Sequence, residues 1–431
     1  MIGYALIALG LVVLIFLGFP VGFAAGAIST LGAMLFFGDA ADPRVSSMMA
    51  RLLLDKIDNF LLLAIPFFLL AGRLMNTGGI TERLFGFVSL ASRPLKGGLA
   101  HANVLASTLF AGMSGSATAD AVGLGTVEMR AMLAEGYSRE FSAGITAASS
   151  LIGPIIPPSI ALVAYGVSAE VSIGALFMAG IVPGLLLAAV LMGYVAVCAY
   201  RYDFPSGQLP PWRDLGRSFR RAFLPILMPV IIIGGIRGGI FTPTEAAAIA
   251  AAYAIILSVF VYREIDGRLL FAEIRQTMID SAVIMLILAF TSSLGVVMIQ
   301  GQVPQRLAEF LTAVTTSPTL LMLMLCAFWM VVGLFMAQTP GILVLTPILV
   351  PTADAFGIDL IYFGIIMTLT LTLGLLTPPV GMVLYALTRV TGLSFERLAL
   401  VSVPYIAIIL CLIILLVFVP EIILFLPRLS G

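Results

Sequence analysis

The sequence predicts an all-α integral membrane protein made of two inverted repeats, each with a re-entrant helical hairpin and a broken helix. Three observations predict this fold. Of the 431 residues, 61% are hydrophobic and only 10% are charged, and apolar runs of about 20 residues, long enough to cross a bilayer, recur along the chain. Sequence motifs repeat between the two halves. Two apolar runs are interrupted by proline pairs, Pro157–Pro158 and Pro378–Pro379, and interior prolines break helices.

The apolar runs place membrane helices in two sets of five. We expect the first set at about 2–18, 20–38, 60–77, 139–165 and 172–200. We expect the second set at about 223–240, 243–262, 281–300, 359–388 and 397–425. Other segments are amphipathic, which is typical of helices that lie on the membrane surface. These segments are about 44–58, 80–92, 212–222, 268–280 and 304–316.

The two halves match at a nearly constant offset in the numbering. FPVGFAAGA at 19–27 aligns with TPTEAAAIA at 242–250, and the pair Pro157–Pro158 aligns with Pro378–Pro379. An offset that hardly changes along the chain indicates internal duplication. We therefore expect a first repeat over residues 1–200 and a second over 223–425, joined by a cytoplasmic connecting loop at 201–222.

Charge distribution predicts how the repeats are oriented. Each repeat has an odd number of predicted crossings, so the second repeat should be inverted relative to the first. With the N-terminus outside, the inner segments are 78–98, 130–140, 201–222, 263–280 and 389–397, and these hold most of the arginines. Because cytoplasmic segments carry an excess of Lys and Arg, both termini are predicted to lie outside.

Each repeat contains a Gly-, Ser- and Thr-rich region between its third and fourth helices. These regions are predicted to be the re-entrant hairpins, at about 100–132 and 318–352. Non-helical backbone survives at membrane depth only where protein or a water-filled cavity satisfies it. The broken helices follow at about 139–165 and 359–388. A break frees carbonyl and N–H groups, which inverted-repeat transporters use to bind ions and substrates.

Pairing each hairpin tip with its neighbouring break predicts two Na⁺ sites. Site one comprises Gly112, Ser114, Ser116, Gly153, Ile156 and Ser159. Applying the offset of the proline pairs gives site two, with Gly333, Gly374, Thr377 and Val380. Between them, the residues expected to face a substrate are Ser116, Ala117, Thr118, Gln338, Thr339, Pro340 and Pro379. Small residues in membrane helices can instead serve close packing.

Asp120, next to the first hairpin tip, is a further candidate for the cation site. An acid inside a membrane protein is by default a functional hypothesis. The alternative is a structural acid paired with Arg130 or with a backbone N–H.

The chain resembles the large membrane subunit of TRAP (tripartite ATP-independent periplasmic) transporters, the DctM-like permeases. The resemblance spans nearly all of the chain and rests on IPFFLLAG (65–72), FAGMSGSATAD (110–120), GPIIPPS (153–159) and GLLTPPVG (374–381). It implies an elevator-type, Na⁺-coupled symporter that takes up a small carboxylate, such as a C4-dicarboxylate or a sialic acid, across a bacterial inner membrane. Both termini would then be periplasmic.

The resemblance also implies two partners. One is a small four-helix membrane subunit, expected as a separate chain, and the other is a periplasmic substrate-binding protein. Na⁺ is the only cofactor expected, and with a net charge of zero nothing suggests nucleic acid as a partner.

Three other functions have to be distinguished from this one. A stand-alone Na⁺/dicarboxylate symporter and a passive channel remain open as alternatives. Gly112-Met113-Ser114-Gly115 matches the nucleophile motif of rhomboid proteases, but a serine nucleophile needs a base and no histidine follows Ser114. We therefore do not expect an enzyme.

Overall fold

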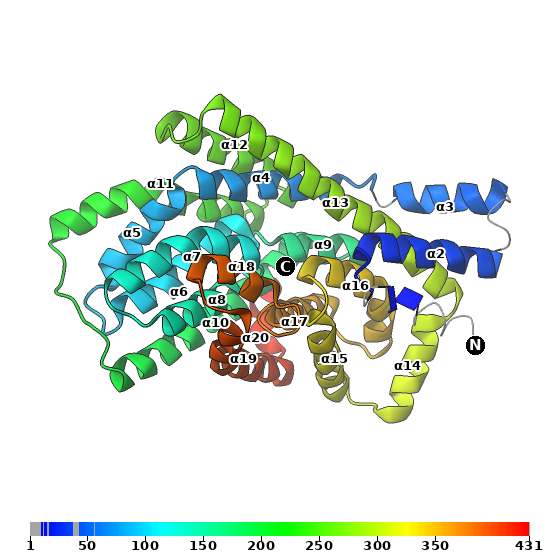
Figure 1. The fold of residues 1–431 in the computed structure, drawn as a ribbon. Helices are drawn as coiled ribbons and strands as arrows, with labels where there is room; N and C mark the ends of the chain where they lie inside the picture. Colours follow the sequence, from blue (N-terminus) through cyan, green and yellow to red (C-terminus); the bar gives the residue numbers. More distant parts are fainter. Residues whose placement is uncertain (1–9, 12, 15–16, 38–42, 56, 431) are drawn as a thin grey trace.

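The computed structural model describes residues 10–11, 13–14, 17–37, 43–55 and 57–430. Within these ranges the regular structure is entirely helical, without a strand (Figure 1). The first predicted helix, 2–18, lies largely outside the described residues.

The helices differ widely in length, from the 4 residues of η1 to the 34 residues of α13. In chain order they are α2 (Val21–Phe37), α3 (Pro43–Asp55), η1 (Phe60–Leu63), α4 (Ala64–Thr77), α5 (Ile80–Ser92), α6 (Gly98–Ser114), α7 (Ala117–Ala134), α8 (Arg139–Ser150), α9 (Ile160–Ala169), α10 (Ile173–Arg201), α11 (Trp212–Arg237), α12 (Pro243–Ile255), η2 (Ile256–Val261), α13 (Gly267–Gln300), α14 (Val303–Val314), α15 (Pro318–Gly333), α16 (Gln338–Ala355), α17 (Leu360–Gly374), α18 (Met382–Thr391), α19 (Phe395–Phe418) and α20 (Glu421–Ser430).

Six helices among the described residues are long and apolar enough to cross a membrane. They are η1 with α4, α10, α11, α12 with η2, α13 and α19. Counting α14 and α15 as one span gives a seventh, although the two are bent by 117°. Both predicted broken helices occur as pairs of short helices, α8 with α9 and α17 with α18. A multi-pass membrane protein is the class that such helices define.

The helix expected at 397–425 is divided between α19 and α20, which are separated by Val419 and Pro420. Three further expected boundaries are wrong. The segments 212–222 and 268–280 are not separate surface helices, because each continues into a long helix, α11 or α13. The connecting loop accordingly spans residues 202–211 rather than 201–222. The expected boundaries lie where polarity changes, but helical hydrogen bonds join residues four apart and continue across such a change.

The sequence offset pairs helices of the first half with helices of the second half. Paired helices such as α7 and α16 start at corresponding residues, and the packing between the halves is reciprocal. α7 starts at Ala117, and α16 starts at Gln338, the position that the offset of the proline pairs assigns to Ala117. α2 packs on α13 while α4 packs on α12, and α7 packs on α18 while α9 packs on α16. α9, α16, α17 and α18 lie near the middle of the molecule, and α18 lies beside α7 (Figure 1). Each hairpin therefore contacts the broken helix of the other half.

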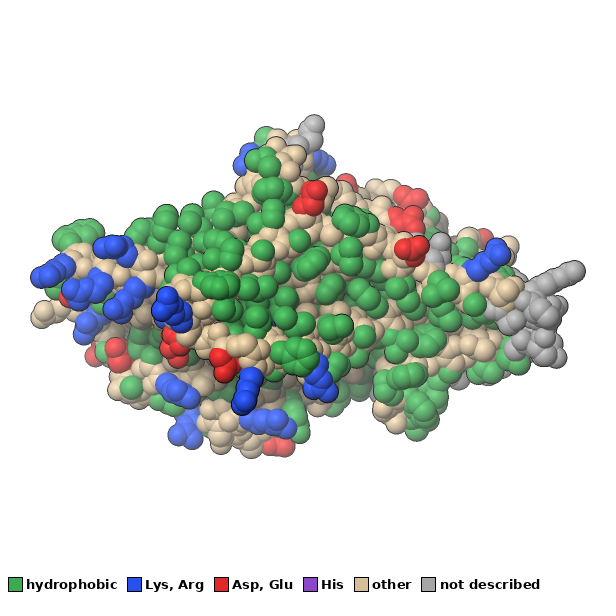
Figure 2. Space-filling view, turned by 90° about the horizontal axis from the view of Figure 1, so that it is seen from above, with side chains coloured by type: hydrophobic (Ala, Val, Ile, Leu, Met, Phe, Trp, Pro, Cys, Tyr) green, Lys and Arg blue, Asp and Glu red, His purple; other side chains and the backbone are tan. Residues whose placement is uncertain are grey.

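The outer surface is largely apolar. Side chains such as Val230, Phe260 and Phe271 are more than half exposed. Figure 2 shows hydrophobic side chains across the middle of one face, with basic side chains gathered toward the end where α11 begins. Soluble monomers rarely expose apolar patches of this extent, so a lipid environment accounts for this surface.

Candidate functional site at the hairpin tips and helix breaks

The first hairpin reverses within two residues, between α6 and α7. Gly115 has φ +61°, a conformation that glycine adopts without the strain of a side chain. A Cβ added to Gly115 would lie 2.6 Å from the carbonyl oxygen of Pro158. Ser116 caps α7, since its side chain accepts a hydrogen bond from the backbone N–H of Ala119 at 3.5 Å. The tip thus rests against the first proline break.

The first break runs from the end of α8 to the start of α9 and contains a cis Pro157–Pro158 bond. The Ser159 hydroxyl makes two hydrogen bonds that stabilise this break. It donates to the carbonyl of Pro154, and it accepts a hydrogen bond from the N–H of Leu162 at 3.2 Å, which caps α9. The hydroxyl of Ser159, which the sequence predicts as part of Na⁺ site one, is thus engaged in hydrogen bonds within the break.

Asp120 lies where the first tip meets the break. Its carboxylate is buried and accepts a hydrogen bond from the Ser114 hydroxyl. The other oxygen, Oδ2, has no hydrogen-bond partner among the described residues and faces Gly153, where an added Cβ would lie 2.4 Å from it. Asp120 is therefore joined to Ser114 rather than to Arg130. An unpartnered buried carboxylate oxygen is costly, and a bound cation would offset that cost.

The second half brings two backbones into contact. α15 ends at Gly333 and α17 ends at Gly374, and a Cβ added to Gly374 would lie 2.6 Å from three backbone atoms of Gly333. The N–H of Val380 donates to the carbonyl of Leu334 at 3.2 Å, and the Thr377 hydroxyl donates to the carbonyl of Leu373 at 3.2 Å. Two helix C-termini, which carry partial negative charge, meet at this point.

A cavity of about 190 Å³ separates the two hairpin tips. Six of the seven residues predicted to face a substrate line it, namely Ser116, Ala117, Thr118, Gln338, Thr339 and Pro340. Pro379 does not line it. Sequence reasoning missed further lining residues, which are Leu69, Gly115, Ile160, Ile284, Ala337, Leu375 and Met382. We call this space the tip cavity.

Four helices begin at the tip cavity. The lining residues Ala117, Ile160, Gln338 and Met382 are the first residues of α7, α9, α16 and α18. Helix N-termini carry partial positive charge and free N–H groups. Serine side chains cap α7 and α9, whereas no described side chain caps α16 or α18. The cavity therefore favours an anion, above all on the side formed by the second half. The two post-break starts, Ile160 and Met382, could have been found by following each proline pair to the next helix.

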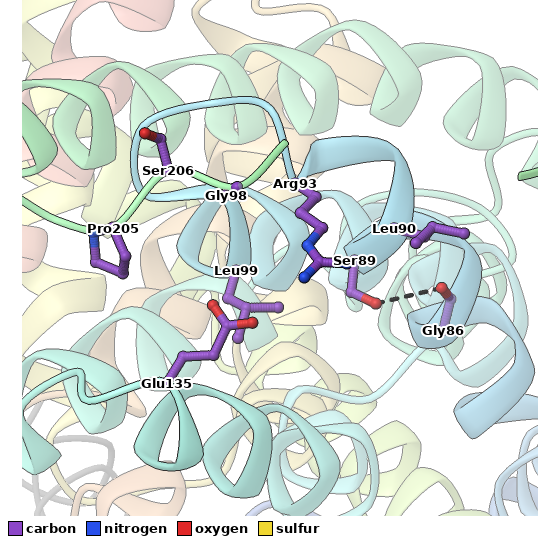
Figure 3. A pocket seen from close by; sticks show the side chains of 10 residues that line it. Gly86, Ser89, Leu90, Arg93, Gly98, Leu99, Glu135, Pro205 and Ser206 are labelled. Carbon is purple, nitrogen blue, oxygen red and sulfur yellow. Dashed lines mark hydrogen bonds between the residues drawn. The ribbon is translucent and has the colours of Figure 1, made fainter. Parts of the chain in front are cut away.

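A larger cavity, of about 480 Å³, lies at the base of the first hairpin (Figure 3). Arg93 from the end of α5 and Glu135 from the end of α7 both reach it (Figure 3). The α10–α11 connection borders it as well, and the N–H of Gly207 donates to the carbonyl of Arg93 at 2.9 Å. None of the predicted site residues lies there, so the tip cavity remains the candidate site.

Comparison with solved structures finds a similar fold. The fold is similar to that of the Alcanivorax borkumensis YdaH transporter, with a TM-score of 0.62 over 88% of this chain and 89% of that one. The two sequences are 15% identical, so this likeness concerns the fold alone.

Sequence comparison gives the family. Residues 8–422 match the model for the tripartite ATP-independent periplasmic transporter, DctM component, and the chain belongs to this family. It is 40% identical to the sialic acid TRAP transporter large permease protein SiaM of Vibrio cholerae, over 96% of each chain. It is 38% identical to the C4-dicarboxylate TRAP transporter large permease protein DctM of Pseudomonas aeruginosa, over 94% of each.

Membership bears on partners and on chemistry. A tripartite family of this kind implies a periplasmic binding protein and a small permease partner. The Haemophilus influenzae sialic acid permease SiaT is 40% identical over 97% of this chain but only 67% of its own length, so small and large permeases occur both fused and separate. These relatives are named as transporter permeases rather than enzymes.

Proposed function

We propose that this chain is the translocating subunit of a Na⁺-coupled symporter that takes up a small organic carboxylate across a bacterial inner membrane. The observation that carries the proposal is the tip cavity, where four helix N-termini converge between two helix breaks. Positive helix ends suit a carboxylate, and carbonyls and hydroxyls at the neighbouring breaks suit Na⁺. Sialic acids and C4-dicarboxylates are the first substrates to test, because similar permeases are named for them.

Two Na⁺ sites are proposed, one on each side of the tip cavity. Asp120 and Ser114 would hold the first ion, together with the backbone at Gly112 and Gly153. The buried carboxylate of Asp120, which has one oxygen without a hydrogen-bond partner among the described residues, supports this. The second ion would lie where Gly333 meets Gly374, with Thr377 and Val380 nearby.

An elevator motion would carry this site across the membrane. The hairpins and broken helices would move together against a scaffold, as two inverted repeats allow. The reciprocal packing of α7 on α18 and of α9 on α16 supports a single moving body. A small four-helix subunit and a periplasmic binding protein would complete the system, with both termini of this chain in the periplasm.

Na⁺ binding can be tested before the substrate is known. The melting temperature of the purified chain would be recorded in Na⁺, K⁺ and choline at equal ionic strength. A ligand that binds only the folded state stabilises it by about 2.7 kcal/mol at a hundredfold excess over Kd. We expect a saturable rise specific to Na⁺ that is smaller in Ser114→Ala and Thr377→Val. Identical melting in all three salts would contradict Na⁺ coupling.

Uptake into proteoliposomes separates symport from the alternatives. With the small subunit and the binding protein present, N-acetylneuraminate or succinate should accumulate only under an inward Na⁺ gradient. Uptake that needs no binding protein would identify a stand-alone symporter. Flux without any Na⁺ gradient, and without saturation, would identify a channel.

A further inference from the structure

Arg73 of α4 lies beside the first hairpin tip. The preceding residue, Gly72, packs directly on that tip, since an added Cβ would lie 3.1 Å from both the Ser114 Cα and the Met113 carbonyl oxygen. Arg73 itself lines a cavity of about 420 Å³. The other lining residues are Leu69, Gly72, Asn76, Phe110, Ser114, Ser116, Thr118, Ala119, Val122 and Asp280. We call this space the side cavity.

The side cavity adjoins the tip cavity. Leu69, Ser116 and Thr118 line both, so a ligand that leaves the hairpin tips past these residues enters the side cavity. Among the described residues that line the two cavities, Arg73 is the one basic side chain. Arg73 is therefore the one full positive charge with which an anion on this path can pair, and it lies next to the negative charge of Asp280 in the same cavity.

Two carboxylates of α13 hold Arg73 in unequal ways. Its Nη2 donates to Asp280, and its Nη1 donates to Glu273 at 3.4 Å. Asp280 lines the side cavity and its side chain is 33% exposed, whereas Glu273 does not line it and is 12% exposed. Gln276 donates to the other oxygen of Asp280 at 3.0 Å. Of the two carboxylates, Asp280 is therefore the one that water or a ligand in the side cavity can reach.

We propose that Arg73 binds the carboxylate group of the transported substrate between the tip cavity and solvent, by exchanging Asp280 for that carboxylate. The inference rests on the proposed function, because it takes the substrate to be a carboxylate. The planar guanidinium presents parallel N–H donors that match a carboxylate. Exchanging one carboxylate for another preserves the number of charged hydrogen bonds, so the substrate can bind and also leave.

The positive charge is tested without knowing the substrate. Thr118→Cys, in a Cys411→Ser background, places a thiol on both cavities. Its labelling rates with a negatively charged methanethiosulfonate (ethylsulfonate) and a positively charged one (ethyltrimethylammonium) are compared. Charged clefts change local ion concentrations tenfold or more, so Arg73→Gln should lower the anion-to-cation rate ratio by about tenfold. Asp280→Asn should raise the ratio, and Arg217→Gln, on the exposed start of α11, should leave it unchanged.

Carboxylate binding is tested by uptake of N-acetylneuraminate or succinate into proteoliposomes that contain the full complex. Arg73→Lys keeps the charge but loses the fork of donors. It should raise KM about tenfold, as loss of one charge-assisted hydrogen bond does, while the Na⁺-dependent rise in melting temperature persists. Unchanged KM in Arg73→Lys and Arg73→Gln would overturn the proposal, as would an unchanged labelling ratio in Arg73→Gln.

Two controls keep these outcomes distinct. If Arg73→Gln fails to fold because Asp280 is left unpaired, the double variant Arg73→Gln/Asp280→Asn removes both charges, and its KM must still rise. If the wild-type complex takes up neither probe, these two substrates are excluded, whereas the labelling ratio still reports whether Arg73 sets the charge of this path.

Discussion

The two halves of the site use different chemistry on the same geometry. In the first half, side chains complete the tip and the break: Ser114 binds Asp120, and Ser116 and Ser159 cap the helices that follow. In the second half the tip and the break meet through backbone, at the Gly333–Gly374 contact, and the corresponding helices have no side-chain caps among the described residues. The two halves thus share a backbone arrangement but differ in the side chains, and in the charge, that complete it.

This difference predicts which half of the site binds the cation and which binds the anionic group of the substrate. Serine hydroxyls already occupy N–H groups in the first half, and the free carboxylate oxygen of Asp120 makes that side acceptor-rich. Uncapped N–H groups leave the second half donor-rich. We therefore expect the first half to bind its cation more strongly and the second half to bind the anionic group of the substrate.

Gly374→Ala should produce the largest effect. Its Cβ would meet the backbone of Gly333 at 2.6 Å, and backbone cannot move aside as a side chain can. Overpacking of this kind costs about 3 kcal/mol, so the melting temperature should fall strongly and Na⁺ should no longer raise it. Gly341→Ala is the matched control, because its Cβ would make ordinary contacts at 3.5 Å with Leu371.

The corresponding change in the first half should be milder for stability. The Cβ of Gly153→Ala would meet chiefly the end of the Asp120 side chain, which can turn away. We expect a small fall in melting temperature but a large loss of the Na⁺ response. Equal destabilisation by Gly153→Ala and Gly374→Ala would show that the two breaks do not differ as described.

Asp120→Asn tests the charge of the first half directly. The amide keeps the shape of the carboxylate but removes its negative charge, so the Na⁺ concentration for half-maximal stabilisation should rise more than tenfold, which corresponds to about 1.4 kcal/mol. Glu128→Gln is the control, since Glu128 is an equally buried acid further along α7. A matching loss in both variants would point to general burial of charge rather than to an ion site.

Adding a helix cap tests whether the free N–H groups at the start of α16 bind the carboxylate. Ala337→Ser would add to α16 an N-cap hydroxyl that can accept from the N–H of Thr339, since Pro340 has no N–H, and such a cap stabilises a helix by about 1 kcal/mol. Because the new hydroxyl competes for N–H groups at the tip cavity, KM for the carboxylate should rise a few-fold even as the melting temperature increases. Ser172→Ala removes the cap of α10, away from the cavity, and should lower stability without changing KM.

The sequence predicted the local features of this site well. Both breaks, both hairpin tips and six of the residues that line the tip cavity follow from proline pairs and small-residue tips repeated at one offset. These signals are local, because proline and glycine act on their own backbone.

Long-range pairing could not be predicted in this way. Arg73 and Asp280 are far apart in the sequence, and a sequence without an alignment gives no sign that they meet. Leu69 and Ile284 reach the tip cavity for the same reason, through the packing of α4 and α13. The unbroken α11 and α13 were missed because polarity marks the membrane boundary and not the end of a helix.

The residues that precede the two hairpins should have the smallest effect on stability when they or their partners are changed. Lys96 precedes the first hairpin and donates to Asp203 at 2.6 Å, whereas Ser317, at the corresponding position of the second half, caps α15 with its side chain. The hydrogen bond from Lys96, and its charge, hold the pKa of Asp203 below its usual value. Because the folded-state pKa is lowered, this pair contributes stability above the ordinary pKa of an aspartate, and the contribution is lost as pH falls through the folded value.

Asp203→Asn should therefore lower the melting temperature slightly at pH 7 and not at all in strong acid, where the wild-type carboxylate is also neutral. Exposed ion pairs are weak and screened by salt, so the difference at pH 7 should also shrink in 1 M NaCl. Ser317→Ala removes a cap and no charge, so its effect should be larger and insensitive to both pH and salt. If the two variants respond alike to salt, the two hairpin entries are not held by different forces.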